Sequence, residues 1–169
     1  MLRALTIKDF AIIEELELNF SPGFTVITGE TGAGKSVIIN ATVLALGGRA
    51  STDVIRTGTD YAQIEALFDI SQQAAVRARL QDAGLSTGDE LVVRRTVSRS
   101  GRSRVYINGS MATGNTLAQI TEGLLDISGQ HAHYSLLRSD IHLDILDRFG
   151  HLETLRTQFE KAFGTVAAL

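Results

Sequence analysis

Polar and hydrophobic residues alternate along residues 16–20 and again along residues 61–70, which is the pattern of a strand with one buried face. Two further strands, 91–97 and 104–108, are predicted on either side of a turn rich in serine, arginine and glycine. The first half of the chain is therefore predicted to be mostly β structure around one helix.

That helix follows a glycine-rich loop. Residues 24–28 are rich in β-branched side chains, so they predict a short strand that leads into the loop. The helical stretch runs from Ser36 to Leu46 and is closed by Gly47 and Gly48. The pattern thus predicts a strand, a loop and a helix in direct succession.

Later in the chain Ser71 is expected to cap a helix that runs to residues 83–84. The elements predicted after the second pair of strands are a helix at 115–122, a short strand at 124–127, a loop at 128–138 and a helix from about 139 to 149.

A stripe of hydrophobic residues then recurs every three or four positions and predicts an amphipathic helix; its members are Leu152, Leu155, Phe159, Phe163 and Val166. Such a stripe suits the root of a coiled coil, and it also suits a terminal helix packed on the domain. Two heptads are too few to decide between these alternatives.

The glycine-rich loop carries a motif in which a glycine and four further residues precede Gly-Lys-Ser; it reads Gly29, Glu30, Thr31, Gly32, Ala33, Gly34, Lys35 and Ser36. Its glycines let backbone N–H groups turn inward, and the N-terminus of the following helix favours an anion. Lys35 is expected to reach the outer phosphates and Ser36 to bind Mg²⁺. The loop therefore predicts binding of ATP with Mg²⁺.

Hydrolysis needs further groups, above all a second carboxylate for Mg²⁺. Asp69 and Asp126 are the candidates, but neither follows the continuous apolar run of a buried strand, and neither is followed by glutamate. We interpret both as structural residues, so this length of chain lacks the elements of a complete small P-loop enzyme.

Composition narrows the class of protein. A chain of 169 residues allows one domain and an appendage, and its 44% hydrophobic and 21% charged content is that of a folded protein. It has no cysteine, a formal net charge of −3 and no secretory signal at the N-terminus. The most apolar stretch, 37–46, is too short to span a membrane. We therefore expect a soluble intracellular protein without membrane contacts.

Five segments together resemble the RecN family of bacterial DNA repair proteins. They are residues 5–13, the loop at 28–36, and the segments 46–50, 101–109 and 126–131. The loop alone is common to many families, whereas its Gly-Glu-Thr-Gly-Ala-Gly-Lys-Ser run together with the later Gly-Gln-His makes the resemblance specific. It covers nearly the whole chain.

The resemblance implies an α/β fold of the P-loop NTPase class, in an ABC-type ATPase head related to structural-maintenance-of-chromosomes proteins. Such heads are split in sequence by a long coiled coil, so residues 1–149 would be the N-terminal part of the head, with an antiparallel β subdomain, and residues 150–169 the root of the arm. The signature sequence, the Walker B Asp with its catalytic Glu and the switch His belong to the family's C-terminal half and have no match here.

The resemblance also implies partners and a location. The implied partners are the C-terminal half of the same head, a second copy of the protein with ATP sandwiched between the two heads, and DNA. The implied location is the bacterial cytoplasm, at the nucleoid. ATP hydrolysis would need the complete head, so this chain alone is expected to be inactive.

Several residues acquire roles from the same resemblance. Gln130 corresponds to the Q-loop glutamine, which contacts Mg²⁺ or the attacking water, and Lys35 to the catalytic lysine. Arg56 lies where related heads place an arginine near phosphates or DNA, with Arg49 as the rival position. Lys8 and Phe10 lie where such heads build part of the adenine pocket.

Arginines cluster on the predicted hairpin, at positions 94, 95, 99, 102 and 104. They could contact DNA phosphates or simply form a solvated face. Two other functions remain open at this point: a self-contained small-molecule kinase, which would need its own acceptor pocket and second carboxylate, and a module that binds nucleotide without turnover.

Overall fold

The computed structural model describes residues 1–29, 34–125, 127 and 142–167. The chain divides into two compact units, Met1–Leu125 and Asp126–Leu169, and each is described by itself. The first unit contains the sheet and the glycine-rich loop, and the second contains two helices.

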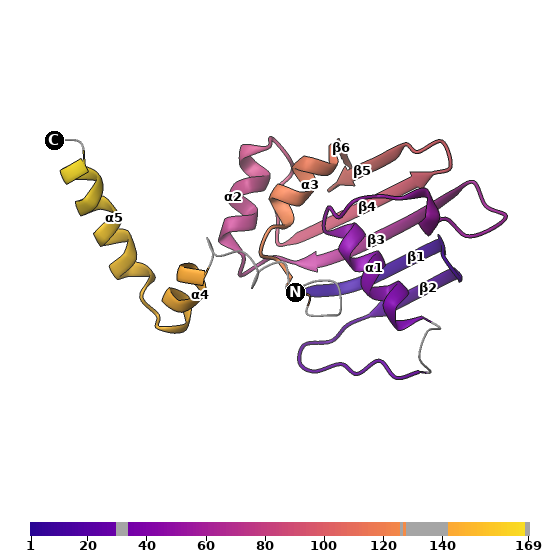
Figure 1. Ribbon diagram of the computed structural model, residues 1–169, viewed down its shortest axis with the longest axis horizontal. Coiled ribbons are helices and arrows are strands. Elements are labelled where there is room, and N and C mark those ends of the chain that lie inside the picture. The colour runs from indigo at the N-terminus through magenta and orange to yellow at the C-terminus, as the bar shows by residue number, and fades with distance from the viewer. Residues whose placement is uncertain (30–33, 126, 128–141, 168–169) are drawn as a thin grey trace. The chain divides into compact units, whose positions relative to one another are not determined.

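The first unit is built on one antiparallel sheet of six strands in the order β2-β1-β3-β4-β5-β6 (Figure 1). The strands are β1 (Leu2–Phe10), β2 (Ile13–Asn19), β3 (Tyr61–Asp69), β4 (Glu90–Ser98), β5 (Ser103–Ile107) and β6 (Ser110–Ala112). The predicted strands at 16–20, 61–70, 91–97 and 104–108 are therefore confirmed, with small differences at their ends.

One face of the sheet forms the core because the side chains alternate along each strand. Cross-strand partners Ile7 and Ile64 both point inward, as do Val93 and Ile107, and all four are almost completely buried. The opposite face carries polar pairs, such as the ion pair of Lys8 with Glu15.

Three α-helices belong to this unit (Figure 1). Helix α1 (Lys35–Ala45) crosses β1, β3 and β4 and buries Ala41, Leu44 and Ala45. Helix α3 (Gly114–Thr121) packs on β5, and α2 (Ala74–Asp82) packs on α3. A single turn of 3₁₀ helix, η1 (Thr52–Val54), follows α1.

Residues 24–28 are not a strand, so that prediction is wrong for the described structure. The segment does not belong to the sheet, and the side chains of Phe24, Val26 and Ile27 are 94%, 62% and 43% exposed. A strand is stable only when its backbone groups pair with a neighbour. The sequence has the propensity, but the described part of the chain supplies no neighbouring strand.

Two smaller predictions also fail. Ser71 does not cap helix α2, which begins after Gln73. The backbone N–H and the hydroxyl of Ser71 both donate to the Oδ1 of Asp69, at 3.1 and 2.7 Å, and form a local turn at the end of β3. The described residues 124, 125 and 127 are not in a strand.

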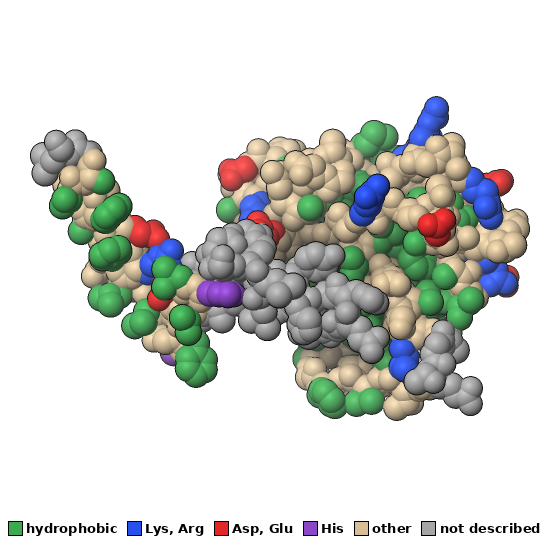
Figure 2. Space-filling model, viewed as in Figure 1, with side chains coloured by type: hydrophobic (Ala, Val, Ile, Leu, Met, Phe, Trp, Pro, Cys, Tyr) green, Lys and Arg blue, Asp and Glu red, His purple; other side chains and the backbone are tan. Residues whose placement is uncertain are grey.

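The second unit contains α4 (His142–Phe149) and α5 (Glu153–Ala167), which contact each other. Arg156 links them by donating to Asp147 at 2.8 Å, and it also pairs with Glu160 one turn later. The predicted helical stripe is present and lies open to solvent, visible as hydrophobic side chains along α5 in Figure 2; its members are Leu152, Leu155, Phe159, Phe163 and Val166. Among the described residues, no helix has both the length and the apolar character that crossing a membrane requires.

Candidate nucleotide-binding site

The N-terminus of α1 is open to an anion. Its N-cap residue is Gly34, which has no side chain to cap it, and the first turn has no acidic residue. The first N–H groups of a helix lack partners within the helix, and they carry the positive end of its dipole. Lys35 is the first residue of this helix, and Ser36, the second, is exposed. The helix end therefore presents donors, a cation and a hydroxyl together.

Lys35 turns back toward the other end of the glycine-rich loop. Its Nζ donates a hydrogen bond to the backbone carbonyl of Gly29, the first glycine of the motif. The residues between, 30–33, lie outside the described part of the chain. An ammonium group has three donors, so this cation can serve both the loop and an incoming phosphate.

The opposite end of α1 is fixed by a buried arginine. Arg95, on the inward face of β4, is 5% exposed. Its Nη1 donates to the carbonyls of Leu44 and Gly48 at 2.8 and 2.6 Å, and its Nε donates to the hydroxyl of Ser103 at 3.1 Å. Burial lowers the pKa of Arg95 from its usual value, because the charged form loses water.

The turn after α1 fits tightly against α3. Thr121 of α3 donates its hydroxyl to the carbonyl of Leu46 at 2.8 Å. Gly47 has φ of +96°, and a Cβ there would lie 2.7 Å from the Cα of Ala118, closer than real contacts allow. The Gly-Gly pair predicted to end the helix therefore also permits this close approach.

Sequence reasoning placed Arg95 on a solvated or DNA-binding hairpin face, and the structure corrects this. The available signal was its position in the strand, since Leu91, Val93, Arg95 and Val97 share one parity and all are buried. Arginine is rarely buried, so its charge predicts an exposed side chain, although its position in the strand predicts a buried one.

The other hairpin arginines have separate surroundings. Arg94 points to the opposite face and pairs with Glu65 at 2.5 Å, which raises the pKa of Arg94. Arg99 donates to the carbonyls of Thr59 and Arg56, so it ties the hairpin to the preceding loop. Arg102 and Arg104 are exposed. The cluster predicted from the sequence is thus not one surface.

Arg56 lies against the turn between β1 and β2. Its Nη1 donates to the carbonyl of Ile12 at 2.8 Å, its Nη2 lies 3.5 Å from Glu14, and its backbone N–H donates to the carbonyl of Asp9. The guanidinium therefore has a structural task at this turn. Arg49, the rival position, is exposed.

The two residues considered for an adenine pocket are also placed. Phe10 is 2% exposed and belongs to the core, so no face of its ring is open to a base. Lys8 pairs with Glu15 at 2.6 Å, and this carboxylate raises the pKa of Lys8.

The expected Mg²⁺ ligand Gln130 lies outside the described residues, as does Asp126. Within residues 1–29, 34–125, 127 and 142–167, no three His, Cys, Asp or Glu side chains gather into a possible metal site. Asp69 accepts hydrogen bonds from Ser71 and Arg3, which hold the pKa of its carboxyl well below the usual range. Asp69 thus has the structural role that the sequence indicated.

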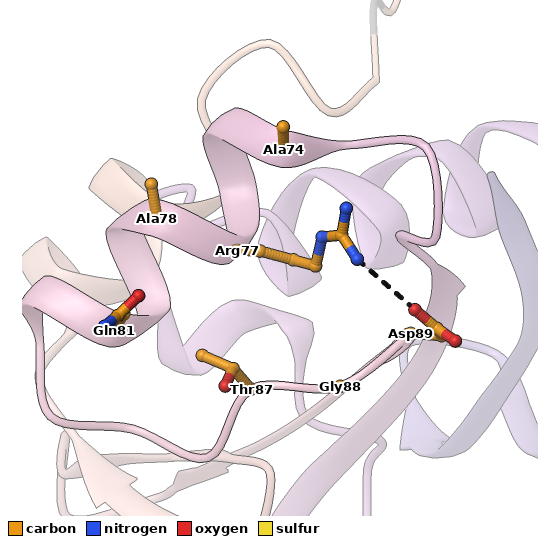
Figure 3. Close-up of a pocket in the computed structure, with 7 residues that line it drawn as sticks. All are labelled: Ala74, Arg77, Ala78, Gln81, Thr87, Gly88 and Asp89. Atoms are coloured by element: carbon orange, nitrogen blue, oxygen red, sulfur yellow. Dashed lines mark hydrogen bonds and ion pairs between the residues drawn. The ribbon is translucent and has the colours of Figure 1, made fainter.

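A separate hollow of about 420 Å³ lies between α2 and residues 87–89 (Figure 3). Arg77 and Asp89 line it and pair with each other across 3.5 Å. Their charges offset one another, and no residue of the glycine-rich loop takes part. We assign it no role in nucleotide binding.

The sequence of this chain is similar to those of known proteins. A family model described as an AAA domain matches residues 4–165. The chain is 43% identical to the DNA repair protein RecN of Halalkalibacterium halodurans over 100% of its own length and 30% of the relative's. It is 45% identical to the RecN of Bacillus subtilis over 90% of this chain and 27% of the relative. The resemblance to RecN is therefore confirmed, and the chain spans about 30% of the length of the curated relatives it matches.

The fold also matches a solved structure, the Smc head domain from Pyrococcus furiosus with an extended coiled coil, bound to the C-terminal domain of ScpA. The TM-score is 0.68 at 25% identity, and the match covers 98% of this chain and 46% of that one. The expected fold class, an α/β ATPase head of the type found in structural-maintenance-of-chromosomes proteins, is confirmed.

Proposed function

The chain belongs to the AAA domain family, and from this premise we propose that it is the N-terminal part of the ATPase head of a RecN-type DNA repair protein. The observation that carries the proposal is the N-terminus of α1, which presents its first N–H groups, the exposed Ser36, and Lys35, whose ammonium reaches the first glycine of the loop. This is the set of groups that binds nucleotide phosphates in P-loop proteins.

The residues of the loop, Gly29 to Ser36, would bind ATP by a division of tasks. The backbone N–H groups and the dipole of α1 hold the phosphates, and Lys35 neutralises charge on the outer ones. The Ser36 hydroxyl, with Gln130, would hold Mg²⁺, which supplies charge neutralisation when bound. Arg56 is retained as a phosphate-facing candidate only if its contacts with Ile12 and Glu14 give way.

Hydrolysis, the attack of water on the γ-phosphate, is proposed for the complete protein. The chain would need the C-terminal half of its own head and a second head across the nucleotide, and DNA would be the third partner. Support for the first partner comes from residues 24–28, where Phe24 and Val26 are exposed and no strand of the described residues lies alongside. A cytoplasmic location at the nucleoid follows from the same proposal.

Residues 150–169 are proposed as the root of the coiled-coil arm. The exposed stripe of α5, from Leu152 to Val166, has the spacing that a partner helix would cover. Residues 1–149 would then be the head part.

Lys35→Ala tests the proposal by titration of the chain with a fluorescent ATP analogue. We expect affinity to be lost, because the substitution removes the side-chain cation of the loop and leaves phosphate charge uncompensated. Lys161→Ala, which removes an exposed lysine of α5, is the matched control and should bind as the unaltered chain does. Equal affinity in all three would exclude the phosphate-binding role.

The rate of ATP hydrolysis, measured on the same protein preparation, distinguishes a half-head from a complete enzyme. The chain alone should hydrolyse ATP negligibly. A rate of about 1 s⁻¹ or more, abolished by Lys35→Ala, would show that the chain is a complete enzyme.

A further inference from the structure

Arg95 is a buried cation whose described hydrogen bonds go to two carbonyls and one hydroxyl. Buried charges are normally paired with an opposite charge. Here the carbonyls of Leu44 and Gly48, at the negative end of the dipole of α1, take the place of a carboxylate. The same helix begins at Lys35, so the two cations stand at its two ends.

We propose that Arg95 is a positioning residue for nucleotide binding: by holding the C-terminal end of α1 against β4, it fixes where Lys35 and Ser36 meet the phosphates. The inference rests on the proposed function, and it adds to that function a residue on a distant strand. A helix is stiff along its axis, so a constraint on one end sets the position of the other.

The C-terminal end of α1 is held from two sides. Arg95 reaches it from β4, and Thr121 binds the Leu46 carbonyl from α3. Gly47 lets this turn approach the backbone of Ala118 closely. Sliding α1 along its axis would therefore break hydrogen bonds to both elements.

The role must be geometric rather than a direct attraction between Arg95 and the phosphates. Helix α1 has 11 residues, which separates its ends by roughly 16 Å at about 1.5 Å per residue. Because the Coulomb energy falls as the inverse of distance, the attraction across about 16 Å is only about a quarter of that across about 4 Å in the same medium. Misplaced binding groups, in contrast, make poorer hydrogen bonds to the phosphates, because hydrogen bonds weaken steeply as their angle departs from linear.

The test compares nucleotide affinity with stability in four variants of the 169-residue chain. Arg95→Met removes the guanidinium, and Arg95→Lys keeps a charge but cannot bridge two carbonyls with a planar fork. Arg94→Met is the matched surface control, since Arg94 is the next residue on β4 and pairs with Glu65 on the other face. Val97→Ala is the stability control, because it makes a cavity in the same strand while keeping the guanidinium of Arg95.

We expect Arg95→Met to raise the Kd for a fluorescent ATP analogue by at least about tenfold, measured well below its melting temperature, as misplaced loop groups would. Arg95→Lys should also raise Kd, which an electrostatic role would not produce. Arg94→Met and Val97→Ala should stay within about twofold of the unaltered chain, since both keep Arg95 and its two carbonyl partners.

Two results would overturn the proposal. One is an Arg95→Met or Arg95→Lys protein that binds the analogue as tightly as Val97→Ala at a similar melting temperature. The other is a Kd for Arg95→Lys equal to that of the unaltered chain when Arg95→Met does not fold. Failure of the proposed function has a different signature, because Lys35→Ala would then bind as the unaltered chain does.

Discussion

Strand β3 and residues 24–28 are both predicted from the sequence to be strands, but only β3 forms one. Both are rich in aromatic and aliphatic side chains, yet β3 pairs with β1 on one side and β4 on the other, while residues 24–28 are not a strand. Phe68 in β3 is completely buried, and Phe24 is 94% exposed. The difference teaches that strand propensity reflects neighbours available for pairing and packing more than the segment itself.

The largest expected effect comes from truncating the same side chain in the two regions. Phe68→Ala should lower the free energy of unfolding by about 3–5 kcal/mol, because it leaves a cavity in the core. Phe24→Ala in the chain alone should change it by less than about 0.5 kcal/mol, as for other surface substitutions. Urea denaturation of both variants measures this. A substantial loss with Phe24→Ala would mean that residues 24–28 already pack in the isolated chain.

Amide hydrogen exchange should sharpen the comparison. In the chain alone, residues 24–28 should exchange fast and residues 61–69 slowly, because only the latter have strand partners. Adding the C-terminal half of a RecN-type head should slow exchange in residues 24–28 by at least about tenfold, which corresponds to about 1.4 kcal/mol of protection. The exchange rate of residues 152–166, measured in the same experiment, should fall as well. Unchanged exchange in both segments would contradict a missing half-head partner.

A smaller effect on stability is expected at the end of β3, where the carboxylate of Asp69 accepts hydrogen bonds that hold the strand end in place. Residues 24–28 contain no carboxylate of this kind. Hydrogen bonds from Ser71, and then from Arg3, hold the pKa of Asp69 below its usual range. A folded-state pKa below the unfolded value of about 3.9 means that this contribution is complete above about pH 5 and is lost as pH falls. Asp69→Asn should therefore flatten the decline in melting temperature between about pH 4 and 2. Parallel curves for the two proteins would refute this role.

The sequence predicts the antiparallel part of the fold well because its signals are local. Alternation along 61–70 places each inward side chain of β3 correctly, and the pair Asn108 and Gly109, with φ of +48° and +81°, makes the predicted tight turn. It fails at residues 24–28 because the deciding contact is not local. It fails at Ser71 because the hydroxyl has a nearer acceptor in Asp69.

In the candidate site, too, the residues in a local motif are predicted and those that depend on distant contacts are not. The loop motif alone identifies Lys35 and Ser36, since the chemistry requires these residues at this spacing. Arg95 could not be found by motif, because its role depends on two carbonyls about 50 residues earlier in the sequence. Arg56 was placed by resemblance near phosphates, whereas its contacts are with the turn between β1 and β2.

The exposure of Phe24 and Val26 also matters during synthesis of the protein on the ribosome. In the curated relatives the matched stretch is the N-terminal 30% or so of the protein, which leaves roughly 400 residues to be translated after it. At about 5–20 residues per second, the ribosome needs roughly 20–80 s to complete them. If the same length follows this chain, its β-prone residues 24–28 stay without those later residues through the whole interval. Pro22 and Gly23 stand directly before this segment, and such residues discourage pairing between growing chains.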